Sequence, residues 1–123
     1  MKLQLIFTAL AALLIAGTVG AQNKDPKRLQ QAKDRVENMA RYVKMDAATT
    51  EKVTELTYQH IVEVSAHIKQ KNSMPEEEYQ SKGKAMHREY GKALRALLNE
   101  EQVAGFNEWS KLPREERTKK ITQ

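Results

Sequence analysis

Apolar side chains in this chain recur at steps of three and four residues, and after residue 25 only three prolines interrupt the pattern. Residues at this spacing share one face of an α-helix, whereas a half-buried strand alternates apolar and polar residues. Pro26, Pro75 and Pro113 stand at the boundaries between periodic segments, and no strand-like alternation bounded by turns occurs. The sequence therefore predicts an all-α fold.

Four helices are expected, arranged as two helix-loop-helix hairpins. The first spans 26–45, and the second, capped by Asp46, reaches about residue 71. Ser73-Met74-Pro75-Glu76 reads as a capping box with proline in the first turn of the third helix. Asn99 and Gln102 cap a short fourth helix that ends before Pro113. The third helix carries an apolar seam of Tyr79, Gly83, Met86, Tyr90, Ala93 and Leu97.

The first 21 residues have the features of a secretory signal peptide. Met1-Lys2 gives a positive start, an apolar segment follows, and small residues end at Ala21. A retained membrane anchor is the alternative, but the apolar segment is shorter than the roughly 20 residues that span a bilayer. We expect cleavage after Ala21 and a periplasmic location, with no transmembrane anchor left in the mature chain.

The mature chain would contain few large apolar residues and no cysteine. The absence of cysteine excludes disulfides, thiolate metal sites and a cysteine nucleophile. A domain of about 100 residues without disulfides depends on its own core or on a partner subunit. We therefore expect residues 22–112 to form one elongated, thin-cored domain, with a homodimer as its assembly and a basic, frayed tail at 113–123.

The two predicted turns resemble each other. Met45-Asp46-xx-Thr49 and Leu98-Asn99-xx-Gln102 each pair a large apolar residue with a capping side chain. Eight residues after the apolar start come Val53 and Phe106, and eleven after it come Leu56 and Trp109. The repeat is a folding device that clamps one helix end and caps the next.

This arrangement resembles the LTxxQ motif of the Spy/CpxP-like periplasmic helical proteins. Leu98-Asn99-xx-Gln102 is similar to the motif, and Met45-Asp46-xx-Thr49 looks like a degenerate first copy. Neither copy has the family's threonine, and Thr49 replaces the glutamine in the first. The resemblance implies a thin, curved four-helix dimer that shields unfolded proteins without ATP, assists stress signalling, or senses metals.

A positive face is the first candidate site. Lys84, Arg88, Lys92 and Arg95 follow steps of four, four and three residues, which place them on one side of the third helix. We expect them to form a client-binding surface for acidic or unfolded proteins, and nucleic acid is disfavoured because no aromatic residues interleave the stripe. The alternative is a solvated face that keeps the protein soluble. Further members of the predicted surface are Arg41, Lys44 and Met86.

A metal site is the second candidate. His60, Glu63 and His67 share one side of the second helix, but the two histidines are about 10 Å apart along a straight helix. A divalent transition metal would need a further ligand, such as His87 or a residue of a second subunit. The alternative places both histidines at the rim of a helix seam, with Glu63 and His67 as a simple pair.

The sequence does not favour an enzyme. It has no glycine-rich phosphate loop and no readable serine–histidine–acid arrangement. The run Glu76-Glu77-Glu78 lies in a first helical turn, where negative charge complements the helix dipole. We expect no cofactor other than the metal considered above. The leading hypothesis is an exported, ATP-independent binding protein with a chaperone-like or envelope-stress role. The alternatives are a periplasmic metal- or stress-sensing accessory and a structural or surface-interaction protein.

Overall fold

The computed structural model describes residues 24–121, and this part of the chain contains helices and no strands. The predicted signal peptide lies outside the described residues. The elements, in chain order, are α2 (Pro26–Met39), α3 (Ala47–Lys69), the 3₁₀ turn η2 (Lys71–Ser73), α4 (Glu76–Ala96), α5 (Glu100–Ser110) and the short α6 (Arg114–Thr118). The all-α prediction is confirmed.

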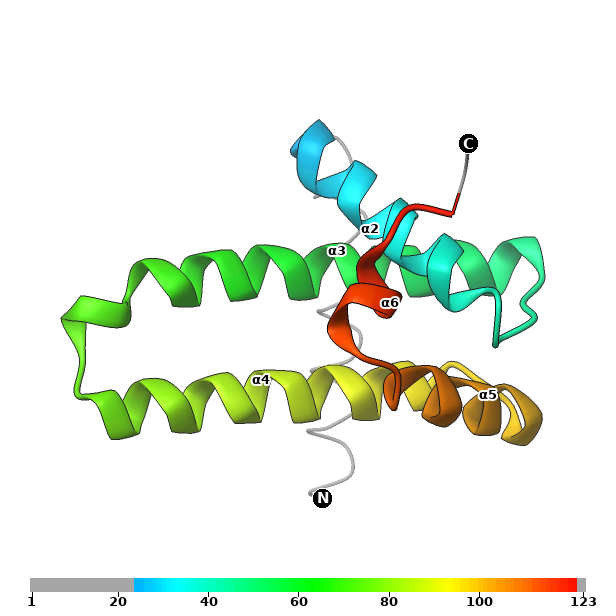
Figure 1. Cartoon of the computed structure of the whole chain (residues 1–123). Helices are drawn as coiled ribbons and strands as arrows, with labels where there is room; N and C mark the ends of the chain where they lie inside the picture. Colours follow the sequence, from blue (N-terminus) through cyan, green and yellow to red (C-terminus); the bar gives the residue numbers. More distant parts are fainter. Residues whose placement is uncertain (1–23, 122–123) are drawn as a thin grey trace, which may run out of the picture.

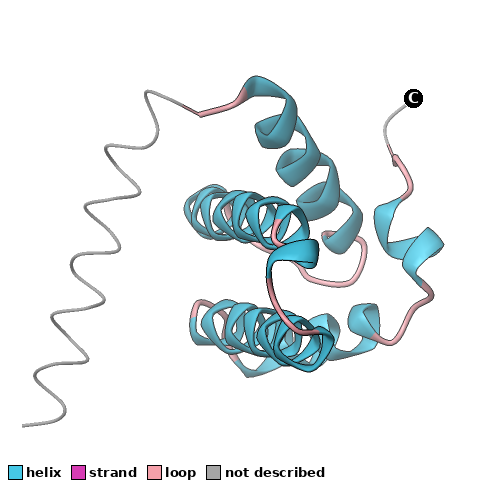
Figure 2. Ribbon diagram, turned by 90° about the vertical axis from the view of Figure 1, so that its left-hand side faces the viewer, coloured by secondary structure: helices cyan, strands magenta, loops and turns pink. Residues whose placement is uncertain are grey.

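The long helices α3 and α4 run side by side in opposite directions and are joined through η2 (Figure 1). Helix α2 packs across α3, and α6 packs against α2. Both lie on the same side of the α3–α4 hairpin (Figure 2). The end of the hairpin near η2 projects beyond the other helices, which makes the molecule elongated. Between residues 24 and 121, no helix is both long enough and apolar enough to cross a membrane.

The two predicted turns form matching caps. The Asp46 carboxylate accepts a hydrogen bond from the backbone N–H of Thr49 at 2.8 Å, and Asn99 Oδ1 accepts one from Gln102 N–H at 2.8 Å. Both cap residues have extended backbone conformations, with φ and ψ of −76° and 175° at Asp46 and −84° and 178° at Asn99. Gln102 Oε1 also accepts from Asn99 N–H at 2.9 Å, so the predicted cap at Asn99 is a full capping box.

Other predicted helix ends are wrong. Helix α2 ends at Met39 rather than near Met45, because Arg41 N–H and Arg41 Nε both donate to the Asn38 carbonyl and close the last turn. The predicted capping box at Ser73 is also wrong. Ser73 belongs to η2, where its N–H donates to the Gln70 carbonyl at 2.9 Å, and α4 begins after Pro75 with no side-chain cap.

The hydrophobic core gathers where the two turns meet. Phe106 and Trp109 of α5 pack with Val53 of α3, and Met45 and Leu98 cover them from the two turns. The predicted seam of α4 is corrected at its end, because Leu94 is fully buried while Leu97 is exposed. A smaller cluster joins α2 to α3. The buried core residues are Val36, Met39, Val43, Val53, Leu94, Phe106 and Trp109, and the smaller cluster is Ala32, Tyr58 and Ile61.

The two turns touch each other through backbone atoms. Gln102 Nε2 donates to the Lys44 carbonyl at 2.7 Å. A Cβ atom on Gly105 would lie 2.1 Å from the Tyr42 carbonyl oxygen, so only glycine allows α5 to approach this closely. At Gly83, in the predicted seam of α4, the neighbour is a side chain instead. There a Cβ would lie 3.3 Å from His67 Nε2.

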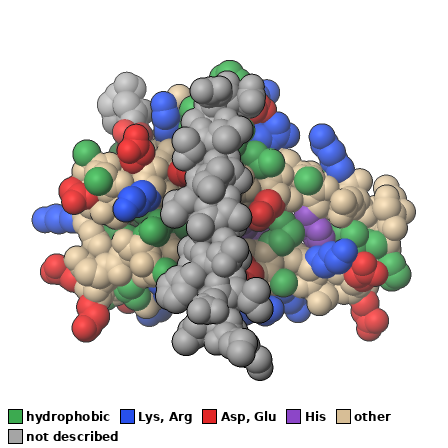
Figure 3. All heavy atoms as spheres, turned by 180° about the vertical axis from the view of Figure 1, so that it is seen from behind, with side chains coloured by type: hydrophobic (Ala, Val, Ile, Leu, Met, Phe, Trp, Pro, Cys, Tyr) green, Lys and Arg blue, Asp and Glu red, His purple; other side chains and the backbone are tan. Residues whose placement is uncertain are grey.

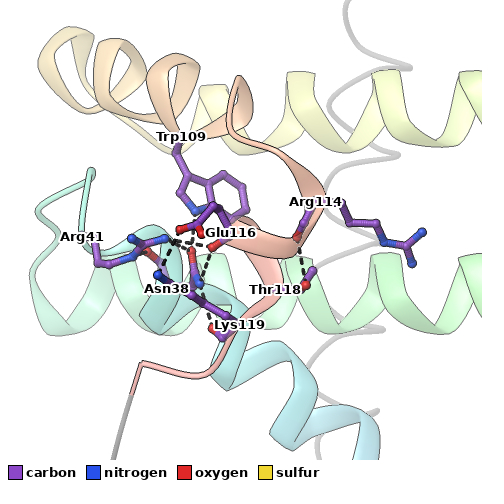
Figure 4. A network of polar contacts seen from close by, with 7 residues as sticks. All are labelled: Asn38, Arg41, Trp109, Arg114, Glu116, Thr118 and Lys119. Carbon is purple, nitrogen blue, oxygen red and sulfur yellow. Dashed lines mark hydrogen bonds and ion pairs between the residues drawn. The ribbon is translucent and has the colours of Figure 1, made fainter.

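The prediction of a frayed tail is wrong for the residues of α6. The fully buried Asn38 side chain donates to the carbonyls of Glu116 at 2.9 Å and Lys119 at 2.8 Å (Figure 4). Its Oδ1 accepts from Trp109 Nε1 at 2.8 Å and from Arg41 at 2.7 Å. One amide therefore ties α2, α5 and α6 together.

Candidate binding groove

A groove with a volume of about 1010 Å³ runs along the α3–α4 hairpin, and α5 and α6 contribute to its wall. Seven of its lining residues are lysine or arginine, and none is aspartate or glutamate. We call it the basic groove. Its cationic residues are Arg35, Lys84, Arg88, Lys92, Arg95, Arg114 and Arg117.

The cations of the basic groove have no acidic partners within the described part of the chain. All five ion pairs found between residues 24 and 121 involve other lysines and arginines. Arg95 instead donates to Asn107 Oδ1 and lies 5.1 Å from the Phe106 ring centroid, and Arg117 donates to the Leu112 carbonyl. The face turned away from the viewer of Figure 1 mixes Asp and Glu with Lys and Arg (Figure 3). With respect to residues 24–121, the groove thus presents unpaired positive charge.

The floor of the basic groove is built from stacked histidine and tyrosine rings. His60 of α3 stacks on Tyr90 of α4, with ring centroids 4.2 Å apart and planes 12° apart. His67 stacks on Tyr79 at 4.1 Å and 9°. Gly83 leaves room for the His67 ring beside α4. The His67–Tyr79 stack lies beyond the two hydrophobic clusters, whereas Tyr90 of the other stack packs against the main core.

Both stacked histidines are buried. His60 Nδ1 and His67 Nε2 have no hydrogen-bond partner within residues 24–121. Burial, together with the nearby charges of His87 and Arg35, lowers the pKa of His60 to about 4. His60 is therefore neutral at pH 7, which suits its position between two helices.

Two neighbours of His60 also have shifted pKa values. Burial raises the pKa of Tyr90, whose hydroxyl shares a 2.8 Å hydrogen bond with Thr57. Burial lowers the pKa of Arg35, and the charges of Arg114 and Arg117 act in the same direction. Arg35 stays protonated at neutral pH because arginine ionises far above it.

The four predicted cations of α4 all line the basic groove. The other predicted members of the surface do not. Arg41 hydrogen bonds to Asn38 and to the Glu116 carbonyl, and Lys44 lies in the connection before α3. Met86 is half-buried and is not part of the groove lining. From α2 it is Arg35 that reaches the groove.

The predicted metal ligands do not share one environment, because two are buried and one is exposed. His60 and His67 lie in the α3–α4 seam, whereas Glu63 is exposed. His87 lies edge-on to His60, with 5.0 Å between ring centroids. Among residues 24–121, no group of three or more histidine, aspartate or glutamate side chains is arranged to hold a metal ion. The metal site stays a prediction, and the stacks give both histidines a structural role.

Two of the cations that line the groove, Arg114 and Arg117, were not among the predicted site residues. Both belonged to the predicted tail, and Asn38, which holds their helix, was also not among the predicted site residues. A polar residue between Val36 and Met39 on the apolar side of α2 is the signal that marks Asn38. A buried amide needs hydrogen-bond partners from another segment.

Comparisons with protein-family models, with curated proteins and with solved structures found no match to this chain.

Proposed function

We propose that this protein is an exported, ATP-independent binding protein that holds acidic, partly unfolded polypeptide segments in the basic groove. The observation that carries the proposal is a groove with seven lysine and arginine residues and no acidic one. The resemblance of the two turns to the LTxxQ motif supports a chaperone-like or envelope-stress role in the periplasm. We propose no catalytic activity.

The spacing of the cations suits an extended client. Steps of four residues along α4 separate Lys84, Arg88 and Lys92 by about 6 Å each at 1.5 Å per residue. Side chains on one face of an extended polypeptide repeat every two residues, or about 6.6 Å. A segment with acidic residues at alternate positions could therefore place one carboxylate near each cation.

The groove also offers apolar contacts for a client. Val64 is half-buried in its lining, and Ile68 lies at the end near η2 with 57% of its surface exposed, whereas the other apolar lining residues named here, Ile61, Phe106 and Trp109, are buried. Each exposed charge pair contributes little on its own, about 0.2–1 kcal/mol. Weak, multiple contacts of this kind suit a protein that binds and releases many clients without nucleotide.

The experiment compares two charge-reversed forms of the mature chain in an assay for aggregation of a denatured test protein. The first carries Lys84→Glu, Arg88→Glu, Lys92→Glu and Arg95→Glu. The control carries Lys52→Glu, Lys69→Glu, Lys82→Glu and Lys111→Glu, four exposed lysines outside the groove. Both forms have the same net charge, so a general charge effect changes them equally.

We expect the groove variant to require a concentration at least about tenfold higher than the natural chain for the same suppression of aggregation. The reason is that four favourable contacts with the client become repulsive. The control variant should stay within about twofold of the natural chain. Equal loss in both variants, or no loss in the groove variant, contradicts the proposal.

A further inference from the structure

The end of the basic groove near α6 brings three arginines together. Arg35 comes from α2, and Arg114 and Arg117 come from α6, which packs against α2. Within residues 24–121, the guanidinium groups of Arg35 and Arg114 make no hydrogen bond or ion pair that would neutralise them. Three like charges held in one place raise the free energy of the fold unless a counter-charge is present.

Residues 24–121 do not provide that counter-charge. No aspartate or glutamate lines the groove, and Glu116 of α6 pairs with Lys119 instead. Beside the arginines, the buried His60 has an Nδ1 atom without a hydrogen-bond partner in the described part of the chain. The exposed His87 ring packs against His60. Every titratable side chain that lines this end, apart from Tyr90, is thus a cation or a histidine.

The choice of arginine also indicates the ligand class. A guanidinium presents a planar fork of donors that fits carboxylate and phosphoryl oxygens in pairs, whereas lysine presents a single point charge. The three positions near α6 are all arginine, while the stripe along α4 mixes lysine and arginine. Trp109 and Tyr90 give this end of the groove a rigid aromatic wall.

We infer that Arg35, Arg114 and Arg117 form a binding site for a compact, multiply charged oxyanion, of the pyrophosphate or polycarboxylate class. The site uses the groove of the proposed function, but it does not require the occupant of the rest of the groove to be a polypeptide. The anion would neutralise the three guanidinium groups and stabilise the contact between α2 and α6.

The experiment titrates the mature chain with sodium pyrophosphate and, in a second arm, with citrate, at pH 7.5 and low salt. Isothermal calorimetry measures the affinity. Fluorescence of Trp109, the single tryptophan, reports binding at this end of the groove because Arg117 lies 5.9 Å from its ring centroid. We expect one saturable site per chain in at least one arm, and the arm that saturates identifies the phosphoryl or the carboxylate source.

Matched variants locate the site. Arg35→Gln and Arg114→Gln should each weaken binding about tenfold, and Arg35→Lys, which keeps the charge but loses the fork, should weaken it less. Arg28→Gln removes one positive charge from the same helix outside the groove and should change affinity less than about twofold. Circular dichroism melting checks that each variant is folded.

Absence of saturable binding in both arms overturns the inference, as does an equal loss in the Arg28→Gln control. Neither outcome bears on client holding, which the aggregation assay tests separately. Conversely, pyrophosphate binding that depends on Arg35, together with client holding unaffected by the α4 reversals, supports the oxyanion site and contradicts the proposed function.

Discussion

At the scale of single residues, Asn38 connects three helices through one side chain. It is fully buried, donates to two carbonyls at the end of the chain and accepts from Trp109 and Arg41. Asn38→Ala removes these bonds and leaves the buried Trp109 N–H unpaired, so we expect it to destabilise the fold by roughly 2–4 kcal/mol. Urea unfolding measures the change.

Trypsin provides a second readout of the same substitution. The variant should be cut faster after Arg117 and Lys119, because α6 loses its attachment to α2. Asn107→Ala, which removes the more exposed hydrogen bonds from Arg95, is the control and should cost less than about 1 kcal/mol. Similar losses in the two variants would show that Asn38 has no special role.

Two glycines give predictions of opposite sign. Gly105→Ala places a methyl group against the Tyr42 carbonyl, a backbone atom that cannot move aside cheaply, and should destabilise the protein by roughly 2 kcal/mol. Gly91→Ala meets only the flexible end of Arg95 at 3.0 Å, and the gain in helix propensity should make it neutral or stabilising. Thermal melting of both variants checks this. If Gly105→Ala is as stable as the natural chain, α5 does not pack this closely against the Tyr42 carbonyl.

At the scale of elements, the α3–α4 hairpin is sensitive to acid because His60 is buried and neutral. Its pKa is about 4 in the folded chain against the usual 6.5, so the unfolded chain binds more protons between these values. The stabilising contribution is fully present above pH 6.5 and is lost as the pH falls toward 4. After allowance for solvent screening we expect a loss of roughly 2 kcal/mol from this residue.

Urea unfolding at pH 7 and pH 4.5 measures this loss, and His60→Phe isolates it. The phenylalanine can keep the stack on Tyr90 but cannot be protonated. The difference in unfolding free energy between the natural chain and His60→Phe should therefore change by most of the 2 kcal/mol between the two pH values. An unchanged difference would show that His60 does not titrate in this range.

Helix periodicity, caps and the two turns could be predicted because they depend on local chemistry. Asp46 and Asn99 cap the helices expected from their spacing, and Phe106 and Trp109 enter the core near Val53. The predicted end of α2 and the predicted cap of α4 were wrong, because backbone hydrogen bonds in the connecting turns override the side-chain signals.

The residues predicted for the binding surface line the groove only where a single helix defines their positions. The stripe from Lys84 to Arg95 depends on one helical register and lines the groove. The contributions of Arg35, Arg114 and Arg117 depend on how α2 and α6 pack, which no local pattern records. The separation of Glu63 from the buried His60 and His67 likewise follows from α4 covering one side of α3.

At the scale of the whole molecule, the core is small for a chain of this length, and Tyr42, Ile68 and Leu97 are exposed. We expect the mature chain to associate as an elongated homodimer that covers part of this apolar surface. Analytical ultracentrifugation should give twice the mass of the mature chain, with a frictional ratio above that of a sphere. A monomer at tens of micromolar would contradict the dimer.

The central claim is that unpaired cations in the basic groove bind acidic, extended polypeptide. The most direct measurement is the affinity of a fluorescent peptide with glutamate at alternate positions, determined by fluorescence anisotropy for the natural chain and for the two four-site variants. Reversal of Lys84, Arg88, Lys92 and Arg95 should weaken binding at least about tenfold, and added salt should weaken binding to the natural chain. The variant reversed at Lys52, Lys69, Lys82 and Lys111 should stay within about twofold of the natural chain. Equal weakening in both variants, or affinity that salt does not change, would contradict the claim.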